Sequence, residues 1–362
     1  FRMDVISLIS KQPGLPDGEQ GPNDAFGNGF PHTVHGPRLV EFLKEMHEQV
    51  FAHRPRTITV GECPALTPEW ALRLTDRNNP ILDMAFHFDH VGVDQGASKW
   101  EPVPFDLVKL KRIFDRWQVA LTHAGWNSLY WNNHDQPRAL SRFGDVEHYR
   151  VESAKAMATL LHMQRGTPYI YQGEEFGMTN FPFNDISQFQ DLETLNHYRS
   201  VVENGGDAAA ALDGYRRFGR DNARTPVQWN AETEAGFTSG KPWLAVNPNF
   251  PEINAATAQA DRDSIFSHYQ ALIALRHTDQ VVALGDYRLL LPEDPHVYAI
   301  ERTLGREGLL ALINFSSQAQ RVALPSTYEG KEHRVISQNY PTAPLLADQL
   351  ALRPWESVVY RW

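Results

Sequence analysis

Apolar residues along the first 279 positions follow two kinds of periodicity, which alternate along the chain. Short runs rich in β-branched and aromatic residues predict strands, and longer segments with apolar residues three and four apart predict amphipathic helices. The strand patterns cover residues 1–9, 57–61, 82–88, 127–131 and 167–172. The helical patterns cover about 38–51, 107–121, 146–165 and 262–278, with a further helix that starts at Thr67 as N-cap and Pro68. Strand followed by helix, repeated in this way, predicts βα units and a parallel sheet.

Most of the strand-to-strand units, which start near residues 1, 57, 82, 127 and 167, are longer than a minimal barrel repeat of about 30 residues. Residues 11–35 are rich in Gly, Pro and Asn and predict a long loop. Residues 180–260 form a polar, glycine-bearing region with a helix-favouring run at 208–211. The extra length follows the strands, which is where a closed barrel of parallel strands places its active site.

After residue 279 the pattern changes to short apolar segments separated by turn residues. These segments cover 287–291, 297–301, 309–314, 321–324, 333–336 and 357–360. Short strands at close intervals predict a small antiparallel β domain. We therefore expect an α/β domain over residues 1–279 and an all-β domain over residues 280–362.

Composition restricts the partners of the chain. Its 362 residues hold 34 Lys and Arg against 44 Asp and Glu, a formal net charge of −10. An acidic surface opposes binding to nucleic acid or to an anionic membrane, and it suits a small neutral substrate. The lone Cys63 excludes an internal disulfide and fits a reducing compartment, so we expect a cytoplasmic protein. No apolar run reaches the roughly 20 residues of a membrane span, and no heptad pattern indicates an oligomeric state.

Three acidic residues lie where strand patterns end in polar loops: Asp4, Glu62 and Asp135. A closed parallel barrel gathers the carboxyl ends of its strands around one pocket, so these carboxylates are expected to be neighbours. Neighbouring carboxylates with separated pKa values perform glycoside cleavage. Strand alternation also puts Arg2 on the face of Asp4, where a guanidinium keeps a carboxylate ionised. The alternatives are a structural ion pair for Arg2 and Asp4, an exposed loop acid for Glu62 and a core histidine for His134.

Around these acids the sequence resembles a known family. The segments FRMDV, TVGE and NNHDQPRALSRFG are similar to three motifs of the α-amylase superfamily, glycoside hydrolase family 13. QGEEFGMTN and RDNARTPVQW make the chain most similar to the bacterial oligo-1,6-glucosidases, dextran glucosidases and trehalose-6-phosphate hydrolases. The resemblance covers essentially the whole chain. It implies a partial (β/α)8 TIM barrel, strands four to eight with their helices, followed by a small antiparallel β-sandwich.

The resemblance also implies a role for each acid. Asp4 would be the nucleophile and Glu62 the general acid/base, while Asp135 would bind sugar hydroxyls and stabilise the transition state. Retaining hydrolysis by such a pair needs two carboxyl groups about 5–5.5 Å apart, one ionised and one protonated. Further residues implied to line the same subsite are Arg2, His134, Arg220 and Arg224.

Two further residues bear on the substrate. Members of the family that cleave α-1,6 links usually have Val after the nucleophile, so Val5 implies short α-1,6-linked glucosides such as isomaltose. An ordinary β-branched strand residue is the alternative for Val5. Phe88 is expected to form part of a platform for a sugar ring, with core packing as its alternative. Trehalose-6-phosphate hydrolysis, α-1,4 cleavage and transglycosylation stay open, as do a catalytically inactive relative and a sugar-binding module from other classes.

Other polar clusters give weaker signals. Glu174 and Glu175 are expected to be solvated or ion-paired charges at a strand end rather than a second acidic site. The histidines and the aspartate of residues 87–90 have no matching third cluster, so no zinc site is expected. Cys63 lacks the base and orienting group of a cysteine nucleophile.

Part of the sequence pattern of that family is absent from this chain. The chain begins inside a strand pattern, and the first three strands, the small domain inserted after them and the loop that binds calcium in many relatives are missing. We therefore interpret the chain as the C-terminal part of a longer protein. Five strands cannot close an eight-strand barrel, so the chain alone is expected to hydrolyse little. No cofactor is expected to be required, and a calcium site is expected only in that N-terminal part.

Overall fold

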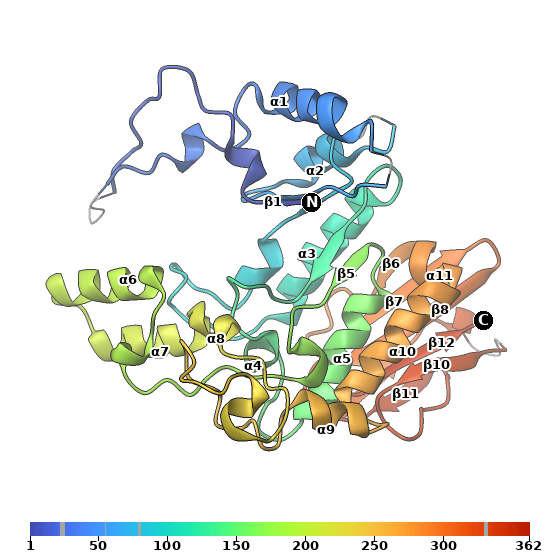
Figure 1. Cartoon of the computed structure of the whole chain (residues 1–362). Coiled ribbons are helices and arrows are strands. Elements are labelled where there is room, and N and C mark those ends of the chain that lie inside the picture. The colour runs from blue at the N-terminus through green and yellow to red at the C-terminus, as the bar shows by residue number, and fades with distance from the viewer. Residues whose placement is uncertain (22–25, 55, 79–80, 329–331) are drawn as a thin grey trace. The chain divides into compact units, whose positions relative to one another are not determined.

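The computed structural model describes residues 1–21, 26–54, 56–78, 81–328 and 332–362 (Figure 1). These residues form two compact units. The first consists of Phe1–His90, Ile113–Leu129 and Arg165–Thr167, and the second of Val91–Arg112, Tyr130–Gln164 and Pro168–Trp362. No helix in the described ranges is long and apolar enough to span a membrane.

The first unit is built on a parallel sheet of three short strands. β1 (Arg2–Met3), β2 (Val60–Glu62) and β3 (Met84–Phe86) lie in that order. Met3 lies opposite Gly61, which in turn lies opposite Ala85. Parallel strands end at one edge of a sheet, so the residues that follow β1 and β2 become neighbours.

A shared apolar core joins the helices of this unit to its sheet. α1 (Leu39–Met46) continues into a π-helical turn at His47–Phe51. In α2 (Pro68–Thr75) the Thr67 hydroxyl accepts the N–H of Trp70, so Thr67 is the predicted N-cap. The buried core residues include Leu39, Leu43, Leu74, Leu82 and Trp117. The predicted order of strands and helices is confirmed in this unit.

The first strand is shorter than the sequence predicts. A strand is expected over residues 1–9, but β1 ends at Met3. Val5 has φ 38° and ψ 37°, in the left-handed region, and a 3-10 turn follows at Ile6–Leu8. A β-branched residue in this region is strained, and side-chain alternation gives no sign of it. The interpretation of Val5 as an ordinary strand residue is therefore wrong.

Two paired strands and two long helices continue the βα order. β4 (Ser128–Tyr130) pairs with β5 (Thr167–Tyr169), and α3 (Leu107–Leu121) precedes them as predicted. In the second unit, α5 (Arg150–Met163) is buried from Ser153 to Met163, and α10 (Ile265–Thr278) packs along it. The predicted helices over 146–165 and 262–278 are thus confirmed.

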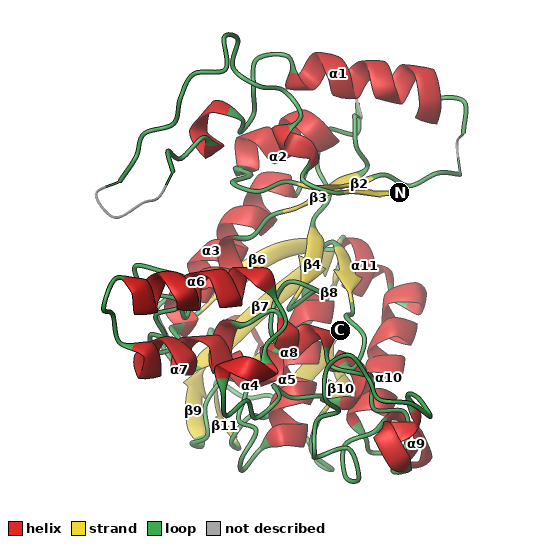
Figure 2. Ribbon diagram, turned by 60° about the vertical axis from the view of Figure 1, so that its left-hand side comes forward, coloured by secondary structure: helices red, strands yellow, loops and turns green. Residues whose placement is uncertain are grey.

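The polar region 180–260 contains several helices, one of which begins at the helix-favouring run 208–211, whereas the sequence pattern did not predict the others. The helices are α6 (Leu192–Glu203), α7 (Ala208–Phe218), α8 (Asp221–Arg224) and α9 (Ala255–Ala260). α6 and α7 lie side by side (Figure 2), and they share a small aromatic core that includes Phe189, Tyr215 and Phe218.

The C-terminal part forms antiparallel sheets, as predicted. One sheet has the order β10-β12-β8-β7-β6, and a second pairs β11 with β9. α5 and α11 (Gln280–Leu284) pack against the larger sheet, while buried side chains of β9 and β11 extend its core. Among the strands of the described C-terminal residues, β11 is the one that the pattern did not predict. The strands are β6 (Asp286–Leu290), β7 (Val297–Leu304), β8 (Glu307–Asn314), β9 (Gln320–Ala323), β10 (Arg334–Gln338), β11 (Gln349–Leu352) and β12 (Ser357–Arg361).

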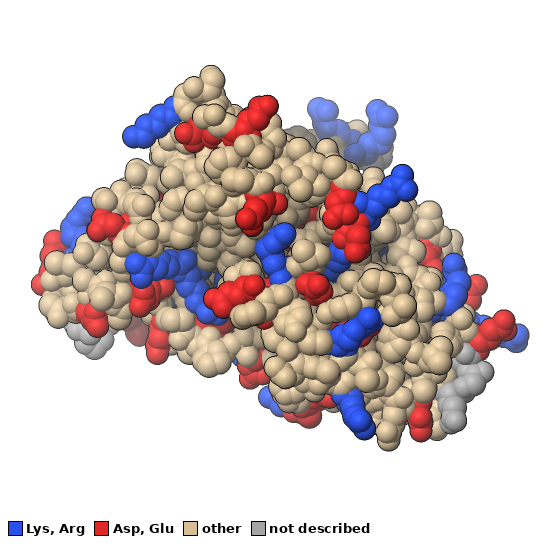
Figure 3. Space-filling view, turned by 90° about the horizontal axis from the view of Figure 1, so that it is seen from below, with Lys and Arg blue, Asp and Glu red and all other residues tan. Residues whose placement is uncertain are grey.

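Charged side chains of both signs are mixed on the surface. On the face shown in Figure 3, Lys and Arg side chains lie among Asp and Glu side chains, with no extended field of one sign. The division into residues 1–279 and 280–362 stays a prediction, because the two compact units cut the chain differently.

Candidate functional site

Two carboxyl groups from different strand ends meet at one guanidinium in the first unit. Asp4 lies just after β1, and Glu62 is the last residue of β2. Arg2 Nη1 donates to Asp4 Oδ1 at 2.9 Å, and Arg2 Nη2 donates to Glu62 Oε2 at 2.5 Å. Asp4 lies close enough to Glu62 to raise the pKa of the Glu62 carboxyl. The parallel register thus brings together acids that are far apart in the sequence.

The environments of these two acids differ. The side chain of Asp4 is 75% exposed and that of Glu62 only 10% exposed. Burial raises the pKa of Glu62 above its ordinary value, and the hydrogen bond and negative charge of Asp4 raise it further. Arg2 and the Val5 N–H oppose this increase. A buried acid beside an exposed one is an arrangement in which one carboxyl holds its proton more readily than the other.

The left-handed backbone at Val5 belongs to this arrangement. The Val5 N–H lies near enough to the Glu62 carboxyl to lower the pKa of that group, and the chain turns directly after Asp4. Strained backbone in folded proteins clusters at functional sites. The Val5 side chain is 39% exposed. Phe88 lies two residues beyond β3 in the same unit and is half-buried.

A second polar cluster surrounds Asp135 in the second unit. Arg224 Nη2 donates to Asp135 Oδ1 at 2.6 Å, and Arg220 Nη1 lies 3.8 Å from the same oxygen. His134 Nε2 lies 3.4 Å from Asp135 Oδ2, and Arg224 Nε donates to the His134 carbonyl at 3.0 Å. Four residues predicted to share a subsite therefore lie together. The Asp4–Glu62 pair and this cluster belong to different compact units, so a joint site stays a prediction.

The cluster continues into residues that sequence reasoning missed. Arg224 Nη1 donates to Asp191 Oδ1 at 3.1 Å, and Arg220 Nε lies 2.9 Å from Glu193 Oε2. Lys99 Nζ donates to the same Glu193 oxygen at 2.5 Å. Asp191 also caps α6 by accepting the Thr194 N–H. An Asp before a short helical run is a sequence signal for such a cap, but nothing in the pattern links it to Arg224.

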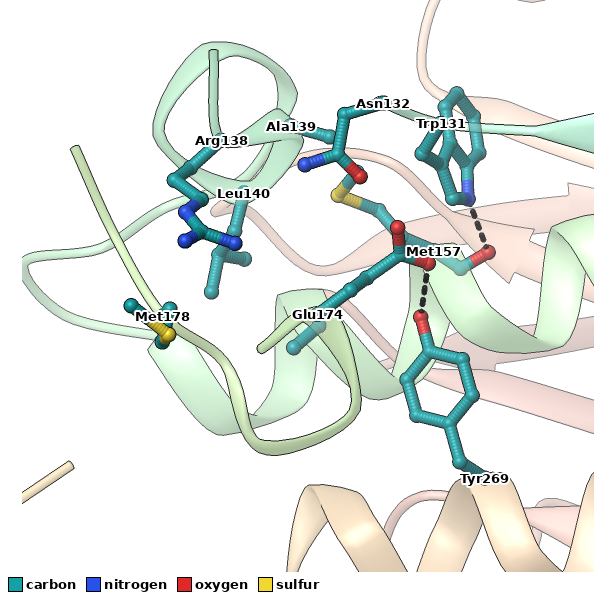
Figure 4. A pocket seen from close by; sticks show the side chains of 10 residues that line it. Trp131, Asn132, Arg138, Ala139, Leu140, Met157, Glu174, Met178 and Tyr269 are labelled. Atoms are coloured by element: carbon teal, nitrogen blue, oxygen red, sulfur yellow. Dashed lines mark hydrogen bonds between the residues drawn. The ribbon is translucent and has the colours of Figure 1, made fainter. Parts of the chain in front are cut away.

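A small cavity in the second unit is lined by residues that follow β4 and β5 in the sequence (Figure 4). Its volume of about 20 Å³ suits a single water molecule. Tyr269 on α10 donates to Glu174 Oε1 at 2.6 Å, while Glu174 Oε2 and Asn132 Oδ1 are buried without a partner in the described structure. Burial raises the pKa of Glu174 to about 8. The prediction that Glu174 is solvated or ion-paired is therefore wrong, because its carboxyl group is buried and bonded to a phenol.

The remaining candidates pack as structural groups. His87 stacks on Trp117 with ring centroids 4.0 Å apart, and the Trp117 indole N–H donates to Asp89 at 2.8 Å. Cys63 is fully buried, and burial raises the pKa of its thiol to about 12. No group of three or more His, Cys, Asp or Glu residues in the described ranges is arranged to hold a metal ion.

Two family models match the chain. The α-amylase catalytic domain matches residues 1–285, and the C-terminal domain of the SusG α-amylase matches residues 297–359. The chain belongs to the α-amylase family. Its sequence matches the catalytic domain of that family, and its structural neighbours are TIM-barrel proteins. The C-terminal part adds an antiparallel sheet.

Several relatives are similar to the chain over nearly its whole length. The oligo-1,6-glucosidase of Parageobacillus thermoglucosidasius is 47% identical over 365 residues, which cover 100% of this chain and 65% of the relative. The trehalose-6-phosphate hydrolase of Bacillus subtilis (strain 168) is 45% identical over 369 residues, covering 100% and 64%. The crystal structure of Bacillus licheniformis trehalose-6-phosphate hydrolase superposes with a TM-score of 0.92 at 43% identity, covering 100% and 64%. The chain thus spans about 65% of the length of the curated relatives it matches.

Proposed function

We propose that the protein carrying this chain is a retaining α-glucosidase that hydrolyses terminal α-1,6-linked glucosides such as isomaltose. The observation that carries the proposal is that the carboxyl groups of Asp4 and Glu62 are both bonded to the guanidinium of Arg2. A retaining mechanism needs two carboxyl groups roughly 5–5.5 Å apart, and two carboxyl groups bonded to one guanidinium are close neighbours. The oligo-1,6-glucosidase relatives, 45–47% identical, support the same reaction.

The reaction proceeds by two displacements. The ionised Asp4 attacks the anomeric carbon while Glu62 gives its proton to the leaving glycosidic oxygen, and a covalent glucosyl ester forms on Asp4. Glu62, now ionised, then takes a proton from water as the water attacks the same carbon and releases Asp4. The pKa of Glu62, raised by burial, suits the first step, in which the carboxyl must arrive protonated. Asp135, held by Arg224, would bind sugar hydroxyls during both steps.

We also propose that β1 to β5 are strands four to eight of the barrel. Among the described residues, β1 pairs along one edge only, with β2. An apolar groove beside β5 is lined by residues that include Ile170, Phe266 and Ile273, and Ile273 is 39% exposed. An open strand edge and an exposed apolar groove are what missing barrel strands would cover. The reaction as proposed needs no cofactor, and we propose a cytoplasmic location.

Replacement of Glu62 by Gln tests the acid/base assignment. An amide cannot donate the proton, so kcat/KM for isomaltose is expected to fall by about 10²–10⁴-fold in the full-length protein. An aryl glucoside with a good leaving group needs little protonation and should lose far less activity. The alkaline limb of the pH profile, which reports loss of the Glu62 proton, should disappear. Full activity of the variant on isomaltose contradicts the assignment.

Replacement of Val5 by Thr tests the linkage. Val and Thr have nearly the same shape, but the hydroxyl group beside the nucleophile alters substrate alignment. The ratio of maltose to isomaltose activity is expected to rise at least about tenfold. The control is Val50→Thr, the same change at a side chain that is 45% exposed on the π-helical turn. An unchanged ratio in Val5→Thr removes the inference about linkage.

Trehalose-6-phosphate hydrolysis is the second candidate. It is favoured by the 43% identical hydrolase structure and by the 45% identical relative from Bacillus subtilis. Assays of the full-length protein on isomaltose, maltose, trehalose-6-phosphate and sucrose, side by side, separate the two functions. Turnover of isomaltose at the highest kcat/KM supports the first proposal. No turnover of any of the four supports a catalytically inactive relative.

A further inference from the structure

The helix that carries Arg224 has only four residues. α8 (Asp221–Arg224) makes a single turn, so most of its carbonyl groups lack partners within the helix. A helix this short is not stable on its own propensity. Its geometry therefore depends on groups from other segments that bond its carbonyl oxygens.

Two side chains from other segments, Arg138 and Tyr171, supply such bonds, and the adjacent Thr225 hydroxyl adds a longer one to the Asn222 carbonyl at 3.4 Å. Arg138 Nε donates to the Asn222 carbonyl at 3.2 Å, and Arg138 Nη2 donates to the Ala223 carbonyl at 3.4 Å. The Tyr171 hydroxyl donates to the same Ala223 carbonyl at 2.9 Å. Arg138 also donates from Nη1 to the Gln172 carbonyl at 2.6 Å. Arg138, the segment 171–172 and helix α8 are thereby joined at one point.

The burial of Arg138 makes these bonds strong and specific. Only 1% of the residue is exposed, and its guanidinium lies 5.4 Å from the centre of the Tyr171 ring. In Figure 4 it borders the small cavity together with Leu140 and Met178. A buried guanidinium bonded to three carbonyl groups holds a single geometry, because each lost bond would leave a buried polar group unpaired.

The residue at the end of α8 makes the contacts of the proposed subsite. Arg224 holds the Asp135 carboxylate at 2.6 Å and the His134 carbonyl at 3.0 Å. We infer that Arg138 and Tyr171 are positioning residues, which fix α8 so that Arg224 holds Asp135 in place for catalysis. The inference rests on the proposed function of Asp135, but the structural part can be tested without it.

Tyr171→Phe is the decisive variant, since it removes one hydroxyl and keeps the ring. In the full-length protein it is expected to lower kcat/KM for the α-glucoside by about 5–30-fold, the range of one lost hydrogen bond. In an Arg224→Lys background the same change is expected to cost less than about twofold, because the route through Arg224 is already broken. Equal losses in both backgrounds would overturn the inference.

Tyr340→Phe is the matched control. The Tyr340 hydroxyl donates to the Pro354 carbonyl at 2.8 Å, a comparable bond far from α8 in the sequence. Its loss is expected to leave kcat/KM within about twofold. Arg138→Lys keeps the charge but cannot reach three carbonyl groups. Like Tyr171→Phe, it should lower kcat/KM in the parent background and have little effect in the Arg224→Lys background.

A measurement without substrate separates this inference from the proposed function. The Arg224 Nε–H, bonded to the His134 carbonyl, is observable by nitrogen-15 NMR in arginine-labelled protein and is assigned with Arg224→Lys. Its exchange with water is expected to become at least about fivefold faster in Tyr171→Phe and to stay unchanged in Tyr340→Phe. Unchanged exchange in Tyr171→Phe refutes the positioning role. Faster exchange in a protein inactive on all four sugars upholds the positioning and rejects only the proposed function.

Discussion

Replacing Asp4 with Ala is expected to reduce kcat for isomaltose by more than about 10³-fold in the full-length protein. The loss follows from the role of the carboxylate, since without it no covalent glucosyl ester forms and water must attack directly. The side chain of Asp4 is 75% exposed and bonded to Arg2, so its removal creates no core cavity. The melting temperature is therefore expected to change little. Steady-state kinetics and thermal unfolding measure the two quantities.

The product that Asp4→Ala forms in the presence of azide identifies the reaction step that fails in this variant. Azide is small enough to occupy the space left by the Asp4 carboxyl and can attack the anomeric carbon once, which gives a β-glucosyl azide of inverted configuration. Asp213→Ala is the matched control, because Asp213 is also exposed, at 69%, and bonded to an arginine, Arg216, at 2.7 Å. The control should retain its activity and show no azide product. Activity within tenfold of the parent in Asp4→Ala would exclude Asp4 as the nucleophile.

Strand order and the positions of the acids could be read from the sequence because both follow from local rules. Each of β1 to β5 overlaps a predicted strand pattern, since buried strands need runs of apolar residues. The proximity of Asp4 and Glu62 then follows from parallel pairing, which aligns the ends of neighbouring strands. The roles of Arg220 and Arg224 came from the family resemblance, and the structure places both beside Asp135.

Other features depend on tertiary contacts that no local pattern encodes. The left-handed backbone of Val5 lies where the chain turns directly after β1 and Asp4, whereas the residue type favours a strand. α6 and α7 start at capping aspartates, Asp191 and Asp207, within a region whose average polarity predicts loops. The burial of Glu174 is set by Tyr269, which lies far along the chain on α10.

That buried carboxyl predicts a dependence of stability on pH. The folded state holds the pKa of Glu174 at about 8, against an ordinary value of 4.5. Below pH 4.5 both folded and unfolded chains carry the proton, and the stabilisation is fully present. Between these values the unfolded chain releases the proton while the folded chain keeps it, so the free energy of unfolding falls as pH rises. The fall ends above about pH 8 and amounts to something on the order of 4 kcal/mol.

The Glu174→Gln substitution removes this pH-dependent contribution to the free energy of unfolding. A glutamine is neutral at every pH, and its carbonyl oxygen can accept the Tyr269 hydroxyl as Oε1 does now. Urea unfolding at pH 8.5 should therefore show the variant more stable than the parent by roughly 2–4 kcal/mol, and the difference should vanish towards pH 5. Other groups facing the carboxyl, Arg138 and Glu175, are unchanged in both proteins.

The comparison isolates Glu174 from the other buried titratable groups. His162 and His268 have pKa values lowered by burial to about 4 and about 3, and they destabilise the fold as pH falls below 6.5. Both proteins share these histidines, so their contribution cancels in the difference. Glu203→Gln, at an exposed position in the last turn of α6, is the control and should shift stability by less than about 0.5 kcal/mol at either pH. A Glu174→Gln difference that is the same at pH 5 and pH 8.5 would show that the Glu174 carboxyl is ionised in the folded chain throughout this range.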